Sequence, residues 1–174
     1  MTVNPAKIRL GAPTSFLIGA QDMGSTKGGV LLRYNQTQML IECDQVLGPI
    51  QVFRTKEEGS IEAAFYETQM AKLGYAAGMQ SLGNVTTVAG TPNVDKITFG
   101  GNVAVSTTTA DLTIPKNDGT TNTLLVHANK VHGYKEIQLD FKRDADTTYK
   151  GTFNMLADPT QAPGQQLFSI SEQY

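Results

Sequence analysis

Two adjacent carboxylates, Glu57 and Glu58, are the first residues in this sequence that could work together as a general acid and a general base. They stand in a short charged run, Lys56 to Gly59, between two stretches in which apolar and polar residues alternate. Adjacent side chains on extended backbone point to opposite sides, so the two carboxylates cannot easily share one substrate. We therefore expect this run to be the turn of a hairpin, with Gly59 free to adopt a positive φ.

The stretch from Gly19 to Thr26 imitates a phosphate-binding loop. Such a loop requires a lysine directly after its second glycine, where the phosphates of a nucleotide would lie. Here Ser25 holds that position and Lys27 comes two residues later. We expect the run from Met23 to Gly29 to be a flexible polar loop between strands.

Metal-binding and nucleophilic residue types are scarce in this chain. His127 and His132 fall at the two ends of one expected strand, without an Asp or Glu at a spacing that indicates a catalytic triad or a zinc site. Asp144 and Asp146 lack the other oxygen donors of a calcium loop. Cys43 lies on the apolar side of its strand, as a buried small side chain would. The sequence predicts no enzyme, no metal and no cofactor.

Composition sets broad limits on fold and partners. The chain has 174 residues, 40% of them hydrophobic and 17% charged, which suits one domain over 1–174 with a core of its own. Its formal net charge is -2 and its basic residues are not clustered, which argues against tight nucleic-acid binding. No apolar run approaches the roughly 20 residues of a membrane helix, and the N-terminal apolar stretch is too short for a secretory signal. We expect synthesis in the cytosol and no membrane binding.

Strands dominate the expected secondary structure. Apolar and polar residues alternate from Thr37 to Asp44, and again in two late runs, 137–141 and 149–155, which should pair as a hairpin. Another hairpin turn is expected at 116–119. The period changes to a helical one only after Glu67. We predict a mainly β fold, an antiparallel β-sandwich or a partly closed β-barrel with one short α-helix.

The order of these features resembles that of bacteriophage major tail tube proteins, whose fold is similar to that of the Hcp tubes of type VI secretion. The matching features are an extended N-terminal arm over 1–13, an Asp44-Gln45 and Gly48-Pro49 strand, an alternating strand that runs into the single helix, and a late strand pair ending at Asp158-Pro159. A C-terminal segment over 158–174 completes the layout.

The resemblance implies a structural subunit that forms hexameric rings, which stack into a tube in the virion tail after assembly in the host cytoplasm. DNA would be a transient cargo of the lumen during genome ejection, and tape measure, terminator and baseplate proteins would be partners. The polar strand side of Gln38, Glu42 and Asp44 is our expected lumen row. Contacts between subunits or rings are expected from the N-terminal arm, the Met23–Gly29 loop, the charged run and the C-terminal segment, at Ile8, Leu10, Met23, Lys27, Lys56, Glu57, Glu58, Leu167 and Phe168.

Two other readings share this strand layout. A tail terminator, baseplate or secretion-tube component would have the same fold in fewer copies. A ligand-binding β-sandwich module, for example for carbohydrate, usually presents an aromatic platform. Aromatic residues make up only 7% of this chain and none is Trp, which disfavours the second reading.

Overall fold

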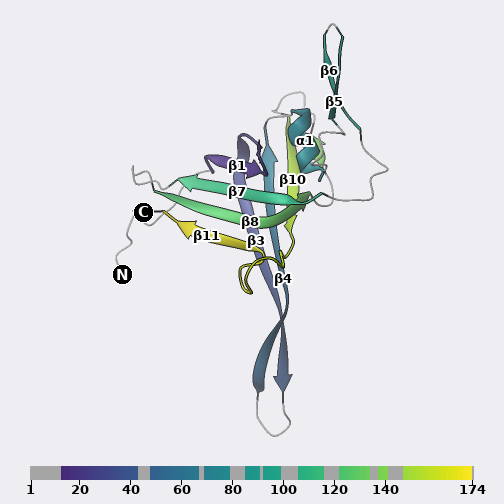
Figure 1. Cartoon of the computed structure of the whole chain (residues 1–174). Coiled ribbons are helices and arrows are strands. Elements are labelled where there is room, and N and C mark those ends of the chain that lie inside the picture. The colour runs from purple at the N-terminus through teal and green to yellow at the C-terminus, as the bar shows by residue number, and fades with distance from the viewer. Residues whose placement is uncertain are drawn as a thin grey trace.

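The computed structural model describes residues 13–42, 48–66, 69–78, 85–90, 92–98, 106–115, 122–133, 137–140 and 147–173. Figure 1 shows their strands, one short helix and a long hairpin that projects from the body. In chain order the elements are β1 (Ser15–Ile18), β2 (Gln21–Asp22), β3 (Thr26–Glu42), β4 (Pro49–Phe65), α1 (Met70–Ala76), β5 (Val85–Val88), β6 (Val94–Ile97), β7 (Thr108–Pro115), β8 (Thr123–Gly133), β9 (Gln138–Asp140), β10 (Thr148–Met155) and β11 (Phe168–Glu172).

The main sheet is antiparallel and follows the order β2-β1-β7-β8-β10-β4-β3. Strand β11 adds to β8, and β9 adds to β10. Strands β5 and β6 form a separate two-stranded sheet. The predicted mainly β fold with antiparallel strands and one short helix is confirmed. The main sheet is not closed into a barrel, which is consistent with a sandwich-like fold.

Aromatic side chains form the centre of the core. The ring of Phe65 stacks on Phe16 with centroids 5.5 Å apart and on Tyr149 at 5.1 Å, and Phe153 meets Phe16 edge to face at 5.8 Å. Offset and edge-to-face contacts of this kind stabilise a core beyond simple burial. The alternating residues of β4 and β10 that predicted half-buried strands supply most of these groups.

Helix α1 confirms the predicted change of period after Glu67. It buries Leu73 and Ala76 against the sheet. Its C-terminal end lies so close to β8 that a Cβ at Gly133 would collide with the backbone oxygen of Ala76 and the backbone nitrogen of Gly78. Gly133 is therefore required by close approach of two backbones. Within the described residues, no helix is long and apolar enough to cross a membrane.

The hairpin of β3 and β4 differs most from the sequence prediction. The run Lys56 to Gly59 is not a turn: it lies inside β4, and Gly59 pairs with Tyr34 of β3. A Cβ at Gly59 would overlap the sulfur of Met155, so this glycine allows β4 to pass close to β10. The run from Met23 to Gly29 is not a free loop either, because Met23 is buried and β3 already begins at Thr26.

The two other predicted hairpins have the expected partners. Strand β7 pairs with β8, and β9 pairs with β10, both antiparallel. The connecting turns at 116–119 and 144–146 lie outside the described residues, as do 1–12 of the N-terminal arm.

Candidate functional site

One part of the molecule lies outside the packed body. We call it the projecting arm, and define it as residues 34–42 of β3 with residues 49–58 of β4. Every side chain of the arm is exposed, whereas from Gly59 onward β4 alternates between buried and half-buried positions. Figure 1 shows the arm extending below the body as a twisted two-stranded ribbon. The packed sheet thus ends where β4 passes Met155.

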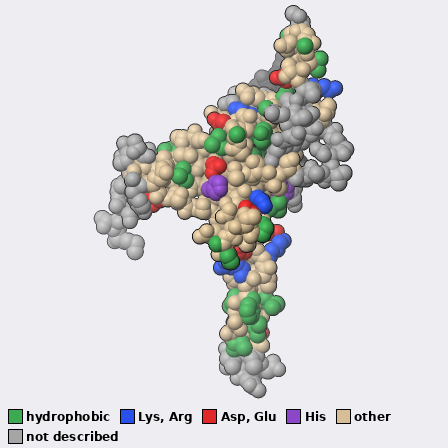
Figure 2. Space-filling view, in the orientation of Figure 1, with side chains coloured by type: hydrophobic (Ala, Val, Ile, Leu, Met, Phe, Trp, Pro, Cys, Tyr) green, Lys and Arg blue, Asp and Glu red, His purple; other side chains and the backbone are tan. Residues whose placement is uncertain are grey.

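The arm is rich in apolar side chains despite its exposure. Register partners across its two strands are Met39 with Phe53 and Leu40 with Val52. Each of these four side chains exposes between 43% and 53% of its surface. Hydrophobic side chains cover much of the arm in Figure 2. A long apolar ribbon with open edges is a surface that other chains bind, because its strand edges and its apolar faces are both uncovered.

The predicted lumen row falls on this arm. Gln38, Leu40 and Glu42 lie on one side of β3, since alternate residues of a strand share a side. Val52 of β4 is opposite Leu40. This side therefore mixes polar and apolar groups, with Leu40 as the apolar exception between Gln38 and Glu42. Asp44 and Cys43 lie outside the described residues.

The opposite side of the arm also departs from expectation. Met39 and Ile41 were expected to be buried because they alternate with polar residues. They are exposed instead, at 53% and 36%. The alternation is present, but the body of the same subunit does not extend far enough to cover it.

A bulge at Thr55 sets the geometry of the arm's base. Thr37 pairs with Lys56 while the next residue of β3, Gln38, pairs with Arg54, so Thr55 is the extra residue on β4. Its hydroxyl donates a hydrogen bond to the backbone oxygen of Thr37 at 3.1 Å. Because the extra residue shifts the alternation, positions 54 and 57 come to share a side.

The charged side chains of the run Lys56 to Gly59 form ion pairs within the chain. The guanidinium of Arg54 donates to the carboxylate of Glu57 at 2.5 Å, and Lys56 is 2.5 Å from the carboxylate of Glu58. Arg54, and to a lesser extent the hydroxyl of Tyr34, lower the pKa of Glu57. The same hydrogen bond raises the pKa of Arg54. Glu57 and Glu58 are thus ion-paired carboxylates on the exposed part of β4.

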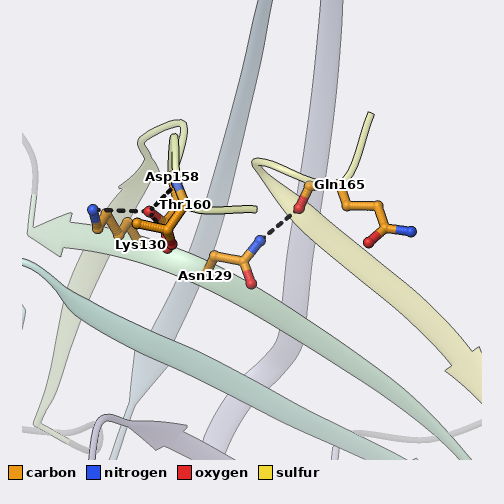
Figure 3. A network of polar contacts seen from close by, with 5 residues as sticks. All are labelled: Asn129, Lys130, Asp158, Thr160 and Gln165. Atoms are coloured by element: carbon orange, nitrogen blue, oxygen red, sulfur yellow. Dashed lines mark hydrogen bonds and ion pairs between the residues drawn. The ribbon is translucent and has the colours of Figure 1, made fainter. Parts of the chain in front are cut away.

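A polar network holds the loop between β10 and β11 against β8 (Figure 3). The carboxylate of Asp158 accepts hydrogen bonds from the backbone NH and the hydroxyl of Thr160, at 3.2 and 2.9 Å, and lies 3.1 Å from the ammonium of Lys130. Asn129 donates to the backbone oxygen of Gln165 at 2.7 Å. The Thr160 NH first, and then Lys130, lower the pKa of Asp158. The Asp158-Pro159 motif is therefore an anchor for the C-terminal strand.

The C-terminal candidates pack within their own subunit. Leu167 and Phe168 are half-buried against the core. The ring of Phe168 meets Tyr34 at the base of the arm edge to face, with centroids 5.6 Å apart. They support the arm rather than present a free contact surface.

The remaining contact candidates differ in their exposure to solvent. Met23 has no exposed surface and belongs to the core, so the expectation that its side chain contacts another subunit is wrong for this conformation. Lys27 is exposed and its ammonium lies 5.6 Å from the ring centre of Tyr66. Ile8 and Leu10 lie outside the described residues.

One polar pair was missed from the sequence. The Nδ1 atom of His127 lies 2.5 Å from a carboxylate oxygen of Asp111 on β7. On the other side of β8, His127 is the register partner of Ser169 on β11, so the three residues form a row across the strands. Sixteen residues separate His127 from Asp111. Only the register of β7 on β8 brings them together, which no local spacing could reveal. The row links the neighbouring strands β7, β8 and β11 of the main sheet.

Among the described residues, no cluster of three or more His, Cys, Asp or Glu side chains could hold a metal ion. No protein-family model matches the chain, and its comparison with curated proteins gives no match either.

Proposed function

We propose that this chain is a self-assembling structural subunit of a phage tail tube, which forms hexameric rings that stack around a DNA-conducting lumen. The projecting arm is the observation that carries the proposal. Its apolar side chains are about half exposed on both faces of a two-stranded ribbon, and β3 has an unpaired edge among the described strands. An exposed apolar ribbon with an open strand edge is a template for pairing with another chain.

The energetics favour assembly in many copies over a single tight contact. Full burial of one large apolar side chain contributes about 1.5–3 kcal/mol, so covering the exposed half contributes about 1 kcal/mol. Covering the six large apolar side chains of the arm would together contribute about 6 kcal/mol. These residues are Met39, Leu40, Ile41, Ile50, Val52 and Phe53. Association costs about 4–15 kcal/mol in lost freedom of motion. One arm contact is therefore weak, and a closed ring with a contact at every junction is much stronger.

The charge of the chain suits a conduit for DNA. A basic lumen would hold phosphates and slow their passage, because each neutralised phosphate adds binding free energy. The chain is slightly acidic, and the charged run at the arm's base is neutralised by its own ion pairs. A passage built from such subunits would not trap its cargo.

The proposal is tested on the purified protein by negative-stain microscopy with mass photometry over a range of concentrations and salts. We expect rings, and a species of about 112 kDa, six times the 18.7 kDa of one chain. At higher concentration the rings should stack into tubes. A protein that stays monomeric at every concentration and salt would refute the proposal, and rings that never stack would indicate a terminator or baseplate component.

A further inference from the structure

The body of the molecule carries a hollow next to strand β3. It has a volume of about 550 Å³ and lies on the outer side of β3, β4 and β10. Small residues line much of it: Gly28, Gly29, Ala64 and Gly151. Gly28 and Gly29 have φ of 78° and 85°, and a Cβ at either would meet nothing within 4 Å. They sit where β3 carries extra residues opposite β4, so the hollow arises from an irregular stretch of strand.

The edge of this hollow carries a positive charge. Lys150 of β10 lines it and is exposed, and its ammonium forms no ion pair with any of the described residues. The one acidic side chain that lines the hollow, Glu62, lies 3.4 Å from the guanidinium of Arg33. The charge of Lys150 is thus available to a partner, whereas the charge of Glu62 is balanced by Arg33.

One face of the projecting arm has the complementary character. Leu40 and Val52 form an apolar pair there, and Glu42 lies two residues beyond Leu40 on the same side. Glu42 is exposed and forms no ion pair with any described residue. This face therefore presents two bulky apolar side chains beside one negative charge, and the hollow presents free space beside one positive charge.

The arm cannot reach the hollow of its own subunit. Val52 and Ala64 belong to the same strand and are twelve residues apart. At about 3.3 Å per residue, the separation is roughly 40 Å. Figure 1 shows β4 ending on the other side of the body from the arm. An arm that occupies the hollow must come from another molecule, and a head-to-tail repeat of this contact between two different surfaces produces rings or filaments.

We infer that the hollow receives the arm of a second copy of this chain, with Leu40 and Val52 over Gly28, Gly29 and Ala64 and with Glu42 paired to Lys150. This inference rests on the proposed self-assembly and names the two surfaces that carry it. It also replaces the expectation that Glu42 faces the lumen.

A charge exchange tests the contact on the full chain. Glu42→Lys and Lys150→Glu each place like charges together, and each should weaken association, measured by sedimentation velocity, by about tenfold or more. The double variant exchanges the two charges and should restore association to within about threefold of the unmodified protein. Lys96→Glu, an exposed lysine on β6, is the matched control and should leave association unchanged.

The size of the hollow is tested separately, without a change of charge. Ala64→Gln fills the hollow and should also weaken association, while circular dichroism and thermal melting of the monomer stay as in the unmodified protein. The inference fails if either single charge reversal leaves association unchanged, or if the double variant folds but does not recover. In both cases the unmodified protein would still assemble, so the proposed function would stand. If the unmodified protein does not associate at all, both fail together.

Discussion

The apolar pair on the arm gives the sharpest prediction about function. Leu40 and Val52 are register partners and expose 51% and 53% of their surfaces in the single subunit. Threonine is β-branched and suits a strand, but it adds a hydroxyl to a surface that must lose water on association. We expect Leu40→Thr with Val52→Thr to weaken self-assembly without unfolding the monomer.

The magnitude follows from the exposed fractions. Covering the remaining half of each side chain contributes about 1 kcal/mol, or about 2 kcal/mol for the pair at each contact. A loss of 2 kcal/mol corresponds to an association about 30-fold weaker. The free energy of unfolding of the monomer should change by less than about 0.5 kcal/mol per site, because surface substitutions away from special contacts have effects of that size.

The chain supplies a matched control. Val88 and Val94 are register partners on the β5–β6 hairpin and are exposed to the same degree, at 53% and 54%. Val88→Thr with Val94→Thr also replaces two exposed aliphatic register partners by threonine, on a different ribbon. Sedimentation velocity over a range of concentrations measures association, and circular dichroism measures folding. Equal losses in the two variants, or no loss in the arm variant, would show that the arm is not the assembly surface.

Two further predictions concern the stability of the subunit. Gly133→Ala places a Cβ against the backbone at the end of α1, which should lower the free energy of unfolding by about 2 kcal/mol and the Tm by about 4–8 °C. Gly151→Ala is the control, because its Cβ would meet its nearest atoms at 3.4 Å. An equal shift of the Tm in both variants would contradict the backbone collision. The pKa of Asp158 is lowered in the folded state from its ordinary value of 3.8, so its stabilising effect is complete above about pH 3.8 and is lost as the pH falls through the lower folded value. Asp158→Asn should therefore lower the urea midpoint at pH 7. In this variant the urea midpoint should also fall less between neutral and acidic pH than in the unmodified protein. An unchanged pH dependence would show that the anchor is not ionic.

Much of the β architecture could be predicted from the alternation of apolar and polar residues. The runs that became β9 and β10, and the run before α1, have the expected type because the periods of strands and helices are local properties of the chain.

The charged run shows where local reasoning was insufficient. Charged residues followed by a glycine are typical of a turn, and Gly59 supports that reading from sequence alone. The glycine is instead required by Met155, which lies almost a hundred residues later in the chain. A close approach between distant segments leaves no local signal that separates it from a turn.

The alternation from Thr37 onward shows the same limit for burial. Alternation with a period of two residues indicates which side chains share one side of a strand. This was correct for Met39 and Ile41. It does not state whether anything lies over that side. The tertiary structure decided this, because the body ends at Gly59 and leaves both faces of the arm in water. The pairing of His127 with Asp111 was likewise decided by the register of β7 on β8. Residue types and their periods set the local conformation, while coverage and register depend on contacts between segments that are far apart in the chain.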